Sequence, residues 1–410
     1  MKKTTIFIII DALRWDYMNE KDTPTLWNMS QEGIYAQKLR PSFGFCERSE
    51  MFTGTRPDVN GNFTAITYNP LASPYKKYKI LFKLFSAIET IPATKKYIRY
   101  FLRHLMPKFP WPVYYIPLNL LSQLYLPEDQ NSHIEPNAFV VESLFDTLTT
   151  NKRTFYYNSF TALTLRNGDD NDRVNLLLSH LKEKKDFYLL YLGNMDIVGH
   201  YKGPNSVERH TEMRKIDTKI KNIVKASKQY YDQINFVIIG DHGMVNVINQ
   251  VDIWSKIKNM EKKNKIKNGK DFVMFLDSTL ARFWFKNKNT ETEIKKLFEK
   301  NFSDYGKIIT SEVAKTFHVP LDTRYGEFIW LANPGILIHP DYFHITGTIK
   351  GMHGYDPSID EQKGTAIVWG NGINSRFLEK VALIDICPTL CDLLQIRYPK
   401  NNQGKSLIKQ

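Results

Sequence analysis

Three apolar segments of the chain each run into an aspartate. Residues 4–10 lead into Asp11, residues 187–192 into Asp196, and residues 235–239 into Asp241. Helical patterns separate these segments, and this alternation predicts a doubly wound, mostly parallel α/β sheet flanked by helices. Ligands of such sheets bind beyond the carboxyl ends of the strands. The three carboxylates are therefore expected to meet in one crevice.

Three histidines accompany these aspartates. A strand-end aspartate alone is commonly a helix cap, and a histidine between glycines is commonly a turn residue. Together, however, carboxylate and imidazole are good zinc ligands, and two divalent ions about 4 Å apart can activate a nucleophile and stabilise a leaving oxygen. The combination predicts a site for two divalent cations, zinc or manganese. The expected ligands are Asp11, Asp196, His200, Asp241, His242 and His353.

The segments FIIIDALRWD, MFTGTRPDVNGN, NMDIVGHYKGP, FVIIGDHGM and GMHGYDP resemble the alkaline phosphatase superfamily. Their order and spacing are most similar to its nucleotide pyrophosphatase/phosphodiesterase branch. The resemblance implies a metal-dependent hydrolase of a phosphodiester or pyrophosphate that is nucleotide-linked or lipid-linked. Sulfatases and phosphotransferases share this fold and remain alternatives. It also implies two ligand sets, one of Asp196, His200 and His353 and the other of Asp11, Asp241 and His242.

The nucleophile of this superfamily bridges the two ions and forms a covalent intermediate. It is threonine in this branch, serine in phosphatases and a modified cysteine in sulfatases. Aligning MFTG without gaps places Gly44, which has no nucleophilic group, at that position. The alternatives are Cys46, Ser42, Ser49 or a water activated directly by the metals. We favour Cys46, because a helix N-terminus and nearby cations lower the pKa of a thiol.

Arg48 follows this block within one helical turn. An arginine there can clamp a phosphate or sulfate bidentately, so it is predicted to bind substrate. The alternative is an ion pair with Glu47 or Glu50. The sulfatase signature C-x-P-S-R is not met from Cys46 onward.

The chain is predicted to have one core with two additions. Residues 1–63, 136–246 and 351–410 form the core, 64–135 a basic aromatic helical insertion, and 247–350 a smaller α+β cap. The net charge of +13 favours anionic partners, and nine Lys/Arg against Glu89 alone lie between Tyr75 and Pro110. The insertion is expected to form basic amphipathic helices, which pack on the protein or attach peripherally to acidic membrane through residues 75–125. No nucleic-acid motif accompanies the charge, which argues against such a partner.

Three cysteines are too few for a disulfide framework, which favours a cytoplasmic location. Peripheral attachment at the membrane is compatible with this location. The apolar N-terminal run is cut short by Asp11, so a strand is expected there rather than a signal peptide. The alternative to an enzyme is a non-catalytic protein that binds membrane or a polyanion. Six retained ligands argue against it, because unused buried carboxylates would need pairing.

Overall fold

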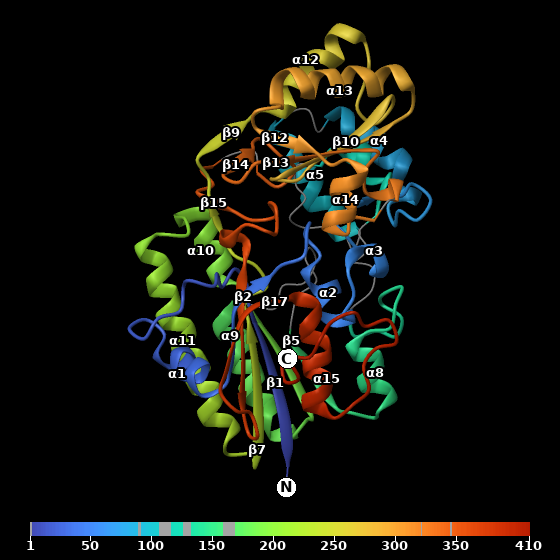
Figure 1. Cartoon of the computed structure of the whole chain (residues 1–410). Helices are drawn as coiled ribbons and strands as arrows, with labels where there is room; N and C mark the ends of the chain where they lie inside the picture. The colour runs from blue at the N-terminus through green and yellow to red at the C-terminus, as the bar shows by residue number, and fades with distance from the viewer. Residues whose placement is uncertain are drawn as a thin grey trace.

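The computed structural model describes residues 2–88, 92–105, 116–125, 133–158, 169–320, 322–344 and 347–410. Figure 1 shows a large sheet between layers of helices in the lower part of the molecule. A second group of strands and helices lies above it. No helix of these ranges is both long enough and apolar enough to cross a bilayer.

The main sheet has the strand order β17-β2-β16-β7-β1-β6-β5 within the described residues. Its strands are β1 (Lys3–Ile10), β2 (Ile34–Arg40), β5 (Phe155–Asn158), β6 (Phe187–Leu192), β7 (Gln233–Ile239), β16 (Gly364–Gly370) and β17 (Arg376–Ala382). Strand β1 pairs in parallel with both β6 and β7, whereas β16 runs antiparallel to β7 and β2. The predicted doubly wound, mostly parallel α/β class is therefore confirmed.

Strand β1 lies in the middle of this sheet and is buried on both faces. Ile6, Ile8 and Ile10 point into one hydrophobic cluster, and Phe7 and Ile9 point into the opposite one. Side chains alternate between the faces of a strand, so a continuous apolar run is what a strand covered on both sides requires.

Helices cover both faces (Figure 1). One layer contains α1 (Pro24–Glu32), α9 (Asp170–His180), α10 (Asn194–Lys202) and α11 (Val207–Ser227). The other contains α2 (Glu47–Thr53), α8 (Leu144–Thr150) and α15 (Ile386–Leu394), and the short α3 (Pro57–Asn60) follows α2. The three apolar segments expected from the sequence, residues 4–10, 187–192 and 235–239, are thus strands β1, β6 and β7, and helices lie between them.

The cap contains a second sheet, antiparallel and ordered β10-β11-β13-β12 over the residues described. It consists of β10 (Phe272–Leu276), β11 (Leu280–Phe285), β12 (Gly306–Ile308) and β13 (Phe328–Ala332), with helices α12 (Ile253–Asn264), α13 (Lys288–Phe302) and α14 (Ser311–Phe317). Short ladders lie between core and cap: β8 (Val245–Asn246) with β15 (Gly351–Met352), and β9 (Asn249–Val251) with β14 (Ile336–Ile338).

The insertion packs against this cap. It contributes β3 (Thr67–Tyr68), α4 (Lys79–Ile88), α5 (Pro92–Leu105), α6 (Leu118–Leu121) and β4 (Leu124–Tyr125). Phe82 and Leu102 share one hydrophobic cluster with Phe275 and Phe283 of the cap sheet. Insertion and cap therefore enclose a common core. The expected aromatic residues Trp111, Tyr114 and Tyr115 lie outside the described residues.

Candidate active site

The parallel pairing of β1 with β6 and β7 brings the three predicted aspartates together. Asp11 directly follows β1, Asp196 lies in the first turn of α10 after β6, and Asp241 follows β7. The amide of Ala12 donates to Asp241 Oδ1 at 3.2 Å. The expected meeting of the carboxylates at one edge of the sheet is what the structure shows.

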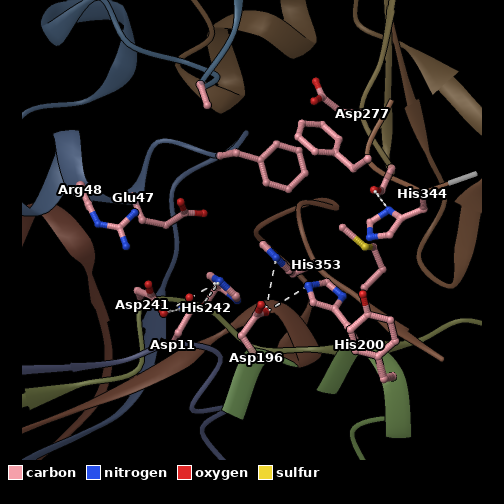
Figure 2. A pocket seen from close by; sticks show the side chains of 16 residues that line it. Asp11, Glu47, Arg48, Asp196, His200, Asp241, His242, Asp277, His344 and His353 are labelled. Atoms are coloured by element: carbon pink, nitrogen blue, oxygen red, sulfur yellow. Dashed lines mark hydrogen bonds and ion pairs between the residues drawn. The ribbon is translucent and has the colours of Figure 1, made fainter. Parts of the chain in front are cut away.

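The six predicted ligands line one cavity (Figure 2). His242 Nε2 lies 2.9 Å from Asp11 Oδ1 and 3.9 Å from Asp241 Oδ1. His200 Nε2 lies 3.2 Å, and His353 Nε2 3.7 Å, from Asp196 Oδ1. The ligand atoms of Asp11, Asp241 and His242 lie within 4.8 Å of one another, and so do those of Asp196, His242 and His353. The rings of His242 and His353 stack at 3.8 Å, so the two sets adjoin.

Backbone carbonyl groups orient two of the imidazoles. His200 Nδ1 lies 2.9 Å from Gly351 O, and His242 Nδ1 lies 2.9 Å from Gly243 O. A proton on each Nδ1 leaves the Nε2 lone pair facing the carboxylates. This is the arrangement typical of metal-binding histidines, whose second nitrogen donates to a carbonyl or carboxylate.

A close approach of two glycines positions His200 against His353. A Cβ on Gly351 would lie 2.5 Å from the carbonyl oxygen of Gly199 in α10, a distance that side chains do not tolerate. The glycine pair therefore lets β15 lie directly on α10. His353, which follows β15, reaches Asp196 because of this packing.

The donor atoms of the site fit divalent cations. Among the described residues, the buried atoms Asp11 Oδ1, Asp196 Oδ1 and His353 Nδ1 have no regular hydrogen-bond partner. Buried polar atoms are normally satisfied, so the two orphaned carboxylate oxygens in one cavity indicate a missing positive partner.

Without a cation, the buried carboxylates and imidazoles of the site shift one another's pKa values in opposite directions. Burial, and then the charge of Asp11, raise the pKa of Asp241 to about 7. Burial acts to raise the pKa of Asp11, but His242 outweighs it and the pKa is lowered. Burial and then the charges of His242 and His200 hold the pKa of His353 well below its usual value. A divalent cation stabilises charged carboxylates and neutral imidazoles together.

The nucleophile block does not present a thiol or hydroxyl to the cavity. Cys46 is 1% exposed, Ser42 4% and Ser49 0%, and none of them lines the cavity. The charge of Cys46 acts, after burial, to raise the pKa of Tyr325, which also lies away from the cavity lining. Cys46 therefore stays a predicted nucleophile, and its buried thiol lies outside the lining of the cavity.

Gly44 cannot be exchanged for the expected threonine without rearrangement. Its φ is +92°, and an added Cβ would lie 2.0 Å from Phe63 O. A side chain at this position is excluded by both the backbone conformation and the available space. The loop conformation therefore requires glycine at position 44, where the superfamily has its nucleophile.

Arg48 lines the cavity as predicted, and Tyr191 connects it to the ligands. The guanidinium carbon lies 5.1 Å from the centre of the Tyr191 ring, and the Tyr191 hydroxyl donates to Asp11 Oδ2. The predicted alternative, an ion pair with Glu50, is taken instead by Arg56 at 3.1 Å.

Sequence reasoning missed part of the lining. Glu47 enters the cavity from α2, and the cap supplies Asp277, Ser278, Phe343 and His344. Glu47 stood in the nucleophile block and could have been found there, since its neighbours were already candidates. The cap residues lie in irregular loops whose pattern carries no signal of their place above the site.

The fold and the paired carboxylate–imidazole sets are those of the alkaline phosphatase class. The chain belongs to the type I phosphodiesterase/nucleotide pyrophosphatase family, whose profile matches residues 5–356.

Relatives agree with this assignment. Rat ectonucleotide pyrophosphatase/phosphodiesterase family member 7 is 23% identical over 419 residues, which cover 97% of this chain and 84% of that protein. Human bis(5'-adenosyl)-triphosphatase ENPP4 is 21% identical over 409 residues, 97% of this chain and 79% of that protein. Other matches are partial: they cover 50% of mouse family member 7 and 27% of venom phosphodiesterase 2 of Crotalus adamanteus. The structure of human ectonucleotide pyrophosphatase/phosphodiesterase 5 superimposes with a TM-score of 0.69 at 16% identity, covering 98% of this chain and 97% of that one.

The two ligand sets predict a definite metal stoichiometry. Zinc-loaded wild-type protein should hold two ions per chain, and Asp241→Asn or His200→Ala should each hold about one, because each removes a ligand from one set. Elemental analysis after gel filtration measures this. His344→Ala is the matched control, since it removes an imidazole from the same cavity but from neither set. Two ions retained in both ligand variants would contradict the assignment.

Proposed function

We propose that this protein hydrolyses a phosphodiester or pyrophosphate bond with the help of two bound divalent cations, zinc or manganese. The observation that carries the proposal is the position of both ligand sets in one cavity of about 410 Å³, together with Arg48. Asp196, His200 and His353 would hold one cation, and Asp11, Asp241 and His242 the other. Such a pair polarises the phosphoryl oxygens and stabilises attacking and leaving oxygens.

Arg48 binds the phosphoryl group in this proposal. Its guanidinium lies in the cavity wall on the same side as Asp11 and Asp241 (Figure 2). Its guanidinium carbon lies over the Tyr191 ring at 5.1 Å from the ring centre, and a guanidinium can donate two parallel hydrogen bonds to a phosphate. The positive charge of Arg48 also offsets the negative charges of Asp11, Asp241 and the bound phosphate.

The remainder of the substrate lies toward the cap. Phe45 and Phe343 are aromatic side chains of the cavity lining, and Phe45 meets His353 edge-on at 5.5 Å. Flat rings favour stacking with a base, and Asp277, Ser278 and His344 offer polar partners beside them. A nucleotide-linked substrate fits this mixture well. Murine ectonucleotide pyrophosphatase/phosphodiesterase 5 has been solved with AMP, as an inactive threonine-to-alanine variant.

Two activities of the same fold compete with this proposal, sulfate-ester hydrolysis and phosphoryl transfer. The metal ligands do not separate them, because substrate contacts rather than fold decide the reaction. Membership of the phosphodiesterase/pyrophosphatase family favours phosphorus over sulfur. Non-catalytic binding of a polyanion is disfavoured by the six ligands and the arginine gathered in one cavity.

Model esters test the proposed reaction. Zinc-loaded enzyme should hydrolyse bis-p-nitrophenyl phosphate in preference to p-nitrophenyl phosphate, and should leave p-nitrophenyl sulfate intact. Arg48→Ala should lower kcat/KM for the diester about 10- to 100-fold, since hydrogen bonds to charged groups contribute about 1.5–3 kcal/mol. Arg173→Ala is the matched control, because Arg173 lies 5.3 Å from the same Tyr191 ring but outside the cavity lining. Preferred sulfate hydrolysis, or an equal loss in the control, would contradict the proposal.

A further inference from the structure

Glu47 enters the cavity from the sequence block in which a hydroxyl nucleophile is expected. It is the first residue of α2, three positions after Gly44, and is 9% exposed. Figure 2 shows its carboxylate directed into the cavity beside Asp241 and His242. The hydroxyl and thiol candidates of the same block, Ser42, Cys46 and Ser49, all lie outside the lining.

Glu47 differs from the other buried glutamate of its helix. Glu50 is paired with Arg56 at 3.1 Å, whereas Glu47 forms no ion pair with the rest of the described chain. A carboxylate that faces the reaction space can accept a proton from an attacking water.

We propose that Glu47 is the general base of a single-step hydrolysis, which rests on the proposed function. A Glu47 carboxylate oxygen takes one proton from the attacking water while the water oxygen forms the new bond to phosphorus. The bond from phosphorus to the leaving oxygen breaks in the same step, and the leaving oxygen keeps the electron pair. Glu47 then returns its proton to solvent. No covalent enzyme intermediate forms, so the absent nucleophile at Gly44 is not needed.

Exchange of the carboxylate for an amide tests this role. Glu47→Gln keeps the size of the side chain but cannot accept the proton, so kcat for the diester should fall about 10²- to 10⁴-fold with KM and zinc content unchanged. Glu50→Gln, the same change on the same helix, should retain kcat. Retained kcat in Glu47→Gln would overturn the proposal, as would loss of a zinc ion, which would make Glu47 a ligand. An inactive wild-type enzyme would instead defeat the proposed function itself.

The stereochemical course gives an independent readout. One in-line displacement inverts the configuration at phosphorus, whereas two successive displacements through a covalent intermediate retain it. A chiral thiophosphate diester hydrolysed in ¹⁸O-water should therefore give the inverted product. Retention would overturn the proposal and return the role of nucleophile to a residue of the chain, for which Cys46→Ala and Ser42→Ala are the variants to compare.

A second, independent observation concerns the outer face of the insertion. Eight of the sixteen large hydrophobic side chains that are exposed in the described residues lie within 71–105. They are Leu71, Ile80, Leu84, Ile88, Tyr97, Tyr100, Phe101 and Leu105, called here the docking face. On α4 and on α5 they recur every four residues, so each helix carries a continuous exposed apolar stripe.

This stripe is additional to the face that anchors the helices. Phe82 of α4 and Leu102 of α5 are fully buried against the cap, and Phe85 and Phe101 pack edge-to-face at 6.2 Å between the two helices. The sequence left open whether these helices pack on the protein or attach to a membrane. In the structure one face of α4 and α5 packs against the cap, and the other face stays exposed. Large exposed apolar patches usually mark an interaction surface.

The charge around the docking face is positive. Lys76, Lys77, Lys79 and Lys83 are exposed beside it, and Glu89 is the one acidic residue in the sequence from 71 to 105. Arg99, expected from the sequence to add to this charge, is instead buried at 2% exposure and donates to Ile116 O. Lys79 and Lys83 of α4, together with Lys76 and Lys77 directly before it, thus form a lysine rim beside the docking face.

We infer that the docking face binds the surface of an acidic lipid bilayer. Apolar side chains of an interfacial helix enter the headgroup boundary while flanking lysines attract anionic lipids. The paired stripes and lysine rim match this chemistry, and a protein partner would not require anionic headgroups. A cytoplasmic location, as expected from the cysteine content, would place the face against an acidic leaflet.

Vesicle sedimentation tests the inference. The full chain should bind vesicles of phosphatidylcholine with phosphatidylserine at least tenfold better than phosphatidylcholine alone, and added salt should weaken binding. The double change Ile80→Asp/Leu84→Asp should abolish binding. Leu176→Asp/Ile248→Asp, which alters two exposed apolar residues outside the face, should leave binding unchanged. Equal binding to both vesicles, equal loss in both variants, or lipid-free self-association through the face would overturn it.

Discussion

The parallel pairing of β1 with β6 and β7 is the constraint on which the site depends. It fixes Asp11, Asp196 and Asp241 at one edge of the sheet, where their carboxylates line a single cavity. Like charges in a buried place are costly unless paired. The imidazoles of His200, His242 and His353 provide ligand atoms but only partial relief. Two divalent cations, as proposed, would satisfy the whole set, so the fold and the proposed cofactor requirement follow from the same geometry.

Much of this arrangement could be predicted from local patterns. The continuous apolar run of β1 predicts a central strand that is covered on both faces. An aspartate directly after this run predicts the edge of the sheet where ligands bind. His200 and His353 were found by their glycine-flanked context. Their contact, however, depends on the Gly199–Gly351 approach between segments 152 residues apart, which no local pattern encodes.

The rest could not be predicted because it depends on which way a loop faces. Cys46 has the chemistry of a nucleophile and lies near the expected position, yet it stays outside the cavity lining, while Glu47 one residue later is part of that lining. Asp277 and His344 come from the cap, whose position over the core is decided by packing of the insertion and the second sheet.

The central claim is that two cations lie between these six side chains. The most direct measurement is anomalous diffraction from zinc-loaded crystals, with data collected above and below the zinc absorption edge. The account predicts two peaks in the cavity, one bound by Asp196, His200 and His353 and the other by Asp11, Asp241 and His242. A cavity without an anomalous peak, with zinc bound elsewhere or not at all, would contradict it.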